Sequence, residues 1–454
     1  MSGLDRSRPP ESGPIRSFDF PEVDRRPLPN GLDLRVGLMR RLPMVSVTLF
    51  VRAGEAALSR ERAGLSVLTA DALEGGTKRR TGSDLAEALE RIGARMSASG
   101  GWEGTSVGLS CLAERLPEAL AILAEALLEP DFPEVEVERA RDQQLAEIRQ
   151  RAMDPSSLAT DSALARYFEA DVPYARPVDG TTESIAAMGR ADLSGYAQAN
   201  YRPGRGGLIV VGDVEPTEVQ RMAGDHFGTW SGDPSTQASL DIGPAARERR
   251  VWIVHRPGSV QSEIRVGHVG AARSTPDYYP LSIANMVLGG MFTSRLNLNL
   301  REKNGFTYGV RSRFTFRSRP GPFQVSTAVG NDVTAAAVRE IVHELTRMSE
   351  AGPTAEEVSA ARDYAAGIFG LQLETAGQVA TRVSQLVVFG LRDDHYDRYR
   401  DEVRAVTTED AAAAAARHIR PNEAQIVLVG DADVVGPSIE ALELGPVEVV
   451  GQDA

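Results

Sequence analysis

The sequence predicts an α+β protein made of two homologous domains, each a mixed, mostly antiparallel sheet with helices packed on one face. Short runs rich in β-branched residues, typical of strands, alternate with longer amphipathic runs, typical of helices. The same order of segments begins again after residue 248, and several motifs return at one fixed interval. A chain of 454 residues is also long enough for two domains.

The first domain is predicted to run from residue 27 to residue 230. The clearest strand is VSVTLFV at 45–51, and the helix at 63–73 places Leu65, Leu68 and Leu73 on one side. Thr81 or Ser83 is expected to cap the helix that follows. Strands are expected at 32–36, 45–51, 95–99, 105–112 and 208–213, and helices at 63–73, 81–93, 117–128, 133–151, 158–170 and 182–200.

Two segments have a composition that does not fit a packed element. Residues 1–26 begin with a stretch rich in Pro, Ser, Gly and Arg, which predicts a disordered lead-in. Residues 231–248 contain two prolines, two glycines and few bulky side chains, which predicts a linker. The second domain is therefore expected at 249–454.

Matching motifs support a duplication. Three pairs lie 218 residues apart (410 minus 192, for example): Asp192 and Asp410, Arg202-Pro203 and Arg420-Pro421, and Gly212-Asp213 and Gly430-Asp431. The last pair closes an apolar strand in both copies, IVVGD and VLVGD. Several matches at one interval are hard to obtain by chance, so we interpret the chain as two copies of one domain.

Composition excludes several classes of protein. The net charge of −13 argues against a nucleic acid or an anionic membrane surface as partner, because both favour a basic face. Cys111 is the only cysteine, so an intrachain disulfide and a multi-cysteine zinc site are excluded. Neither a secretory signal nor a run of 18 apolar residues occurs. We expect a cytoplasmic protein, or a periplasmic one if an upstream segment is missing from the sequence.

The stretch SRLNLNLREKNGFTYGV, residues 294–310, is expected to end an amphipathic helix at Gly305 and to begin a strand near Thr307. Arg301 would lie on the closing turn and Tyr308 on the new strand, so their side chains could converge in one pocket as hydrogen-bond donors. The alternative is that Arg301 offsets the helix dipole and Tyr308 is an ordinary sheet aromatic.

The histidines give no catalytic metal motif. All six occur at or after residue 226, no two are spaced for one helix face, and H-E-x-x-H is absent. His255 and His268 are expected in strands and His343 and His418 in helices, where structural or surface roles are the simplest interpretation.

Two glycine-containing motifs resemble functional loops but lack their context. Gly104–Gly108 has the spacing G-x-S-x-G, but Ser106 runs into a strand rather than a helix, which argues against a nucleophile elbow. Gly289-Gly290 has no lysine at phosphate-loop spacing, so we expect a flexible loop there and no nucleotide site.

Three long segments resemble the pitrilysin/insulinase family of zinc metallopeptidases: GLSVLTADALEGGT from residue 64, the run from LERIGARMSASGG to LLEPDFP, and VLGGMFTSRLNLNLREKNGFTYGV from residue 287. The resemblance extends from about Leu28 over nearly the whole chain. It implies duplicated domains that face each other across a peptide-binding cavity, as in mitochondrial processing peptidase.

The zinc site of the family is degenerate in this sequence. Where the family carries His-x-x-Glu-His, this chain has Val67, Ala70 and Asp71; the third family ligand corresponds to Glu147. Val67 cannot bind a metal and Ala70 cannot accept a proton. Asp71 and Glu147 would provide at most two carboxylates for a weakly held hard cation. Alternatively, Glu147 is a plain helix-face residue. We expect no metal or other cofactor in this chain.

The second half of the family site is retained. Arg301 and Tyr308 match the family spacing R-x6-Y, a pair that donates hydrogen bonds near the scissile carbonyl. In two-subunit members one chain carries the metal and the other this pair. The resemblance therefore implies a non-catalytic subunit whose homologous partner binds zinc. Peptide substrate is expected to contact Gly289, Gly290 and an edge strand at Met96, Ser97, Ala98 and Ser99.

Two other functions remain open. One is a structural scaffold subunit that takes no part in turnover. The other is an independent hydrolase that uses Ser106 or the Asp71–Glu147 pair.

Overall fold

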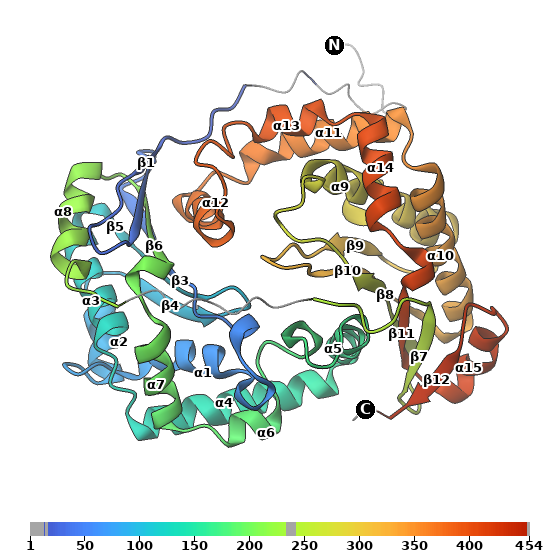
Figure 1. Ribbon diagram of the computed structural model, residues 1–454, viewed down its shortest axis with the longest axis horizontal. Coiled ribbons are helices and arrows are strands. Elements are labelled where there is room, and N and C mark those ends of the chain that lie inside the picture. The colour runs from blue at the N-terminus through green and yellow to red at the C-terminus, as the bar shows by residue number, and fades with distance from the viewer. Residues whose placement is uncertain (1–12, 14–16, 233–241, 452–454) are drawn as a thin grey trace, which may run out of the picture.

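The computed structural model describes residue 13 and residues 17–232 and 242–451, which form two halves with one six-stranded sheet each (Figure 1). The first sheet contains β1 (Val23–Arg25), β2 (Asp33–Leu38), β3 (Met44–Val51), β4 (Arg95–Gly100), β5 (Thr105–Leu112) and β6 (Gly206–Gly212). The second contains β7 (Arg250–His255), β8 (Gln261–Val269), β9 (Arg311–Phe314), β10 (Pro322–Gly330), β11 (Gln425–Gly430) and β12 (Val447–Val450).

The two sheets have the same topology apart from one edge strand. The first has the order β1-β2-β6-β3-β5-β4 and the second β12-β7-β11-β8-β10-β9. In both, one central pair is parallel, β2 with β6 and β7 with β11, and the next three pairs are antiparallel. The equivalence confirms the predicted fold class and the duplication. The extra strand is β1, antiparallel to β2, in one half and β12, parallel to β7, in the other.

Fifteen α-helices occur in the described part of the chain. Those of the first half are α1 (Leu65–Asp71), α2 (Gly82–Arg91), α3 (Leu116–Leu128), α4 (Glu134–Met153), α5 (Pro155–Tyr167), α6 (Thr182–Ala186), α7 (Arg190–Asn200) and α8 (Pro216–Phe227). Those of the second are α9 (Tyr278–Asn285), α10 (Thr334–Ala351), α11 (Ala355–Leu371), α12 (Ala376–Phe389), α13 (Tyr399–Ala405), α14 (Thr408–His418) and α15 (Ala432–Glu440).

Local signals explain several helix boundaries. Thr81 begins α2 as expected, because its hydroxyl accepts the Asp84 backbone N–H while the Asp84 side chain accepts the Thr81 N–H. The single helix predicted at 182–200 is two helices, α6 and α7. Gly189 separates them in an extended conformation, and its backbone N–H donates to Asp192 in the first turn of α7.

One helix of each half packs on the sheet of the other half. Helix α12 packs on β3 and β6, where Val383 and Leu386 are buried with Ile209 and Val211 of β6. Helix α5 packs on β8 and β11, and its apolar side chains share one cluster with β-strand valines of the second sheet. In Figure 1, α12 lies beside the first half and α5 beside the second. Each sheet therefore also carries a helix from the other half on the face opposite its own helices.

Ion pairs join the halves at the α12 seam. Arg35 of β2 is 3% exposed and lies 2.6 Å from Asp393, which follows α12. Arg52 donates a 2.6 Å hydrogen bond to the carbonyl of Val387 in the last turn of α12. A cavity of about 440 Å³ lies along this seam. A larger hollow of about 1070 Å³ is lined by first-half residues alone, and the enclosed peptide-binding cavity implied by the family resemblance stays a prediction.

The prediction of a disordered lead-in over residues 1–26 is wrong for its last part. Strand β1 pairs with β2, and Phe18 and Phe20 contact the ring of Phe369 at 6.0 and 6.5 Å between ring centroids. The apolar side chains of Phe18 and Phe20 therefore anchor the described end of this segment on the second half. Residues 1–12 and 14–16, and the centre of the predicted linker at 233–241, lie outside the described residues. Within the described ranges, no helix is long and apolar enough to cross a membrane.

Candidate functional site

Helix α1 occupies the place where the resemblance locates a zinc-binding helix. Its first turn follows Gly64, which has a φ of 85° and passes so close to the Asp179 carbonyl that a Cβ would overlap it. Of the degenerate positions, Ala70 is fully buried, Val67 is half-buried and Asp71 is exposed. The helix is therefore built and packed, but two of its three family positions, Val67 and Ala70, have side chains that cannot bind a metal.

A buried carboxylate holds the start of α1. Glu55 is 0% exposed and accepts hydrogen bonds from the backbone N–H groups of Gly64 at 2.9 Å and Ser66 at 2.7 Å. Burial raises the pKa of Glu55 to about 7, although these two hydrogen bonds and the Arg176 charge 4.0 Å away oppose the shift. Glu55 therefore satisfies the first helical N–H groups while its own charge is poorly compensated.

Replacing Glu55 with glutamine is expected to flatten the pH dependence of stability. The folded pKa lies above the ordinary value of 4.5, so the folded state binds the extra proton and stability falls as the pH rises from about 4.5 to about 7. A shift of this size corresponds to roughly 3 kcal/mol. Urea unfolding at pH 5 and pH 8 should show a larger loss for the parent than for Glu55→Gln. Equal losses in the two proteins would contradict the assignment.

Four carboxylates gather around the end of α1. Although the Asp71 residue is exposed by surface area, its carboxyl is partly desolvated, and this desolvation, followed by the negative charges of Glu147, Asp179 and Glu74, raises its pKa to about 6. Glu147, on α4, accepts a 3.0 Å hydrogen bond from Gln143. The structure thus places Asp71 near Glu147, the two family positions that carry a carboxylate in this chain. Because Val67 and Ala70 offer no ligand, the family positions do not fit a catalytic zinc ion, which needs about three close donors that usually include imidazole or thiolate.

One group of three metal-binding side chains does occur in the described part of the chain: His255, Asp431 and Asp433, whose candidate ligand atoms lie within 4.8 Å of one another. Its polar atoms already serve the start of α15. Ala432 N–H donates to His255 Nδ1 at 3.1 Å, and Asp431 accepts from the N–H groups of Gly258 and Asp433. No sequence motif indicates this group, because His255 and the two aspartates are far apart along the chain.

The other predicted histidine positions agree with the structure. His268 lies in β8, where burial lowers its pKa to about 3 and its Nε2 accepts the Arg420 N–H at 3.0 Å. His343 lies in α10 and His418 in α14. Ser106 lies in β5 opposite Ser99, so it has the strand context that argued against a nucleophile elbow.

Strand β4 is the free edge of the first sheet and contains the four predicted peptide contacts. Among the described strands it pairs only with β5, and its side chains alternate between exposed and half-buried positions. Glu74 accepts the outward Ala98 N–H at 3.2 Å. Because backbone groups of an antiparallel strand alternate in direction, those of Met96 point to the same free edge as those of Ala98. This edge can accept an extended peptide once Glu74 releases the amide.

Arg301 lies in η8 (Asn297–Lys303), a π-helical segment of the second half. Its guanidinium lies 4.5 Å from the ring centroid of Phe292, which is 66% exposed, and 3.6 Å from the Glu302 carboxylate. π-Helical turns are rare and are frequent at functional sites. The predicted helical position of Arg301 is thus observed, and its contact with Phe292 is a feature that sequence reasoning missed.

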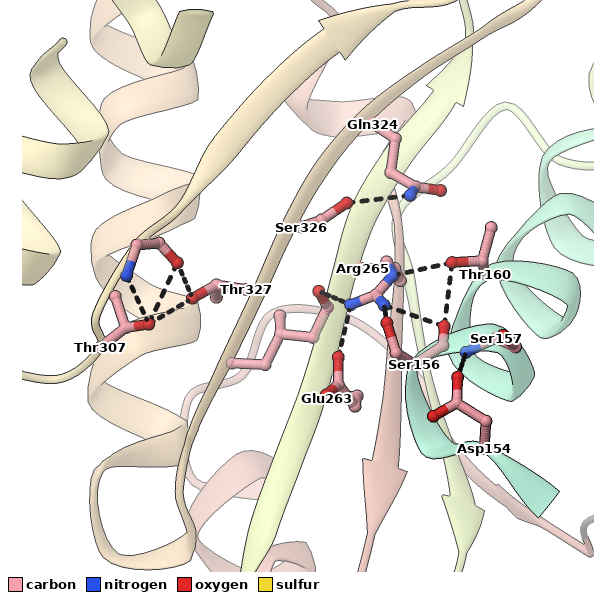
Figure 2. A network of polar contacts seen from close by, with 12 residues as sticks. Asp154, Ser156, Ser157, Thr160, Glu263, Arg265, Thr307, Gln324, Ser326 and Thr327 are labelled. Atoms are coloured by element: carbon pink, nitrogen blue, oxygen red, sulfur yellow. Dashed lines mark hydrogen bonds and ion pairs between the residues drawn. The ribbon is translucent and has the colours of Figure 1, made fainter. Parts of the chain in front are cut away.

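The strand predicted near Thr307 begins only at Arg311, so Tyr308 lies in the preceding loop. The Thr307 hydroxyl accepts the Gly309 N–H at 3.2 Å, and the Thr327 hydroxyl contacts both Thr307 and the Gly309 carbonyl at 3.0 Å (Figure 2). These local hydrogen bonds replace the strand ladder. Tyr308 is 99% exposed, and no contact joins it to Arg301 within the described structure; the two donors do not converge here.

Gly289 and Gly290 are not a flexible loop, contrary to expectation. They end η7 (Met286–Gly290), a second π-helical segment. Gly289 is buried, and a Cβ at this position would lie 2.6 Å from the backbone nitrogen of Ser312 in β9. Close packing against the strand explains this glycine, and Gly290 is exposed at the end of the turn.

Comparison with protein families gives two consecutive matches. Residues 40–181 match the family model described as insulinase, peptidase family M16, and residues 187–364 match the model described as the peptidase M16 inactive domain. The second match contains η7, η8 and the loop with Tyr308, whereas α1 lies in the first.

Similar proteins cover nearly the whole chain. An uncharacterized zinc protease of Mycobacterium tuberculosis is 27% identical over 403 residues, covering 87% of this chain and 90% of the relative. The mitochondrial-processing peptidase subunit beta of Lentinula edodes is 24% identical over 422 residues and covers 89% of each chain.

A solved structure agrees with these matches at the level of the fold. The peptidase M16 inactive domain from Pseudomonas fluorescens superposes with a TM-score of 0.84 at 24% identity, over 90% of this chain and 98% of that one. The two consecutive family models, the relatives that match over nearly their whole length and the duplicated sheet topology all indicate the same family. The chain belongs to the insulinase family of peptidases, family M16.

Proposed function

We propose that this chain is the non-catalytic subunit of a two-chain peptidase. It binds extended peptide and presents Arg301 and Tyr308, while a homologous partner chain provides the metal centre. The observation that carries the proposal is the asymmetry of the family site: α1 has Val67 and Ala70 where ligands and base belong, whereas η8 retains Arg301. The relative named as a subunit of mitochondrial-processing peptidase supports an assembly of this type.

The chain's own contribution would be binding and charge stabilisation. The free edge of β4 offers backbone groups to an extended peptide, and Arg301 and Tyr308 can donate hydrogen bonds to a carbonyl oxygen on which negative charge develops. Phe292 holds the Arg301 guanidinium by a cation–π contact, which limits the side-chain positions that Arg301 samples. Tyr308 must move from its exposed position to join Arg301, and a bound peptide provides the surface that it would cover.

The direct test is reconstitution with a homologue that carries His-x-x-Glu-His and comes from the same genome. We expect neither chain alone to cleave a quenched fluorogenic peptide library efficiently, and the equimolar mixture to do so. A chelator should abolish cleavage, and metal analysis should assign the zinc to the partner. Cleavage by this chain alone, or a mixture no more active than the partner, would contradict the proposal.

A scaffold subunit is the second candidate, and one observation favours it. Tyr308 is 99% exposed and lacks contact with Arg301, so the described chain does not hold the two donors in a catalytic arrangement. A scaffold would form the same stable complex with the partner. Peptide cleavage by that complex would then be indifferent to substitution of Arg301 and Tyr308.

A further inference from the structure

The face of the second sheet that lies opposite its own core is only partly covered. Helix α5 packs over β11 and β8, where Leu158 and Ala163 share a cluster with Val427 and Val429. At the edge of the area that α5 covers, the guanidinium of Arg265 in β8 is already engaged by α5 and by its own strand. It donates hydrogen bonds to Ser156 and Thr160 and pairs with Glu263 at 2.9 Å (Figure 2). The main strand contacts of α5 are thus with β11 and β8, whereas β9 keeps exposed side chains on this face.

Two arginines occupy the uncovered part of this face. In β9, Ser312 and Phe314 are buried and point to the core, so Arg311 and Arg313 point to the opposite face, where both are exposed. Neither arginine forms an ion pair with a carboxylate in the described ranges. Their neighbours across the strand are Ser326 and Gln324 of β10, which are uncharged. The net charge of this strip is therefore positive in a chain whose net charge is −13.

A ligand could reach Arg311 and Arg313 over the face of β9, but it could not pair with the backbone edge of β9. The outward backbone of β9 is already used, because the Asn285 side chain donates to the Ser312 carbonyl at 3.2 Å and Gly289 packs against the Ser312 nitrogen. Strand addition is thus closed at β9. In Figure 1, β9 lies on the inner side of its half, toward the first half and its open edge strand β4. A peptide that extends from β4 into the second half would approach this strand.

We propose that Arg311 and Arg313 select an acidic peptide, with carboxylates at alternate positions of an extended segment. Same-face residues two apart in a strand are separated by about 6.6 Å, which is also the spacing of alternate side chains in an extended peptide. Guanidinium groups bind carboxylates through paired hydrogen bonds. This inference deepens the proposed function and rests on it, because it names the class of peptide that the subunit would bind.

A nucleic acid is the less suitable anion. Two guanidinium groups are few for a phosphate backbone, and the high negative charge of the chain opposes a long polyanion. On α1 and α4, Asp71 and Glu147 add negative charge on the other half. The preference for acidic side chains is therefore confined to the part of the peptide that faces β9.

The test is equilibrium binding to the full chain without a partner, measured by fluorescence anisotropy. Three labelled twelve-residue peptides share one sequence, with Glu, Gln or Lys at two alternate positions. The Glu peptide should bind at least fivefold more tightly than the Gln peptide, and the Lys peptide least. Arg311→Ser with Arg313→Ser should weaken binding of the Glu peptide about tenfold and abolish the difference between the peptides.

A matched control removes two positive charges elsewhere. Arg339→Ser with Arg404→Ser changes exposed residues of α10 and α13, and should alter binding less than twofold. The inference would be overturned if both double variants lost the same affinity for the Glu peptide, or if the Arg311/Arg313 variant lost none. Tighter binding of a single-stranded DNA 12-mer than of the Glu peptide would also overturn it. The binding assay contains no partner chain, so its outcome is independent of the cleavage assay. If the parent chain shows no preference for the Glu peptide while the mixture with the partner still cleaves peptide, only the present inference is refuted. Retained preference without cleavage in the mixture refutes the proposed function.

Discussion

Exchanging Arg301 for alanine and Tyr308 for phenylalanine together is expected to lower kcat of the reconstituted peptidase about a hundredfold or more. Removing a single donor to a developing oxyanion typically costs 10²–10³ in kcat, roughly 3–4 kcal/mol, because such a donor acts where bound substrate excludes water. The measurement is a steady-state titration of peptide with saturating partner. The loss should appear in kcat with a smaller change in KM, since the interaction strengthens in the transition state.

Two further variants separate this result from a general defect. Arg339→Ala alters an exposed arginine of α10 and should leave kcat unchanged. Phe292→Leu removes the aromatic contact of Arg301 and should give an intermediate loss, which Phe292→Tyr should largely restore. If the double variant were as active as the parent while the complex remained intact, the chain would be a scaffold.

Replacing Val383 with aspartate is expected to destabilise the whole chain by roughly 4 kcal/mol or more. Val383 is 0% exposed, and its cluster on α12 includes Ile209 and Val211 of the other half. An unpaired carboxylate buried there has no partner, which is among the most costly single changes. Urea unfolding followed by circular dichroism measures the effect. Val383→Ala, which leaves only a cavity, should cost about 2 kcal/mol.

The control for this experiment is Val434→Asp. Val434 is 57% exposed on α15, so its replacement places the same charge in water and should change stability by less than about 0.5 kcal/mol. Similar losses for Val383→Asp and Val434→Asp would show that α12 is not a structural element shared between the halves.

The sequence predicts where the helices and strands of this fold lie better than it predicts which elements pack against one another. The apolar runs at 45–51 and 208–213 are β3 and β6, because alternation and β-branched content act locally. The helix predicted at 158–170 is largely α5, but its packing on the other half depends on contacts with strands about a hundred or more residues away. No local pattern distinguishes a helix that covers its own sheet from one that covers the neighbour's.

The candidate site shows the same division. The loss of ligands at Val67 and Ala70 is a matter of residue type, so the sequence is sufficient. The position of Tyr308 depends on whether the Thr307 hydroxyl bonds to the backbone of Gly309 or the strand begins early, and the hydroxyls of Thr307 and Thr327 decide this in three dimensions. The raised pKa of Glu55 follows from complete burial, which its neighbours Gly54 and Ala56 do not indicate.

Because α5 and α12 each pack on the sheet of the other half, neither copy is a self-sufficient folding unit, although the sequence repeats. Two polypeptides split between residues 232 and 242 would each expose an apolar surface made for the other. Separately produced, they should aggregate or bind chaperones; coproduced, they should assemble one-to-one without the covalent connection. The duplicated chain thus resembles an obligate dimer whose subunits have been fused end to end.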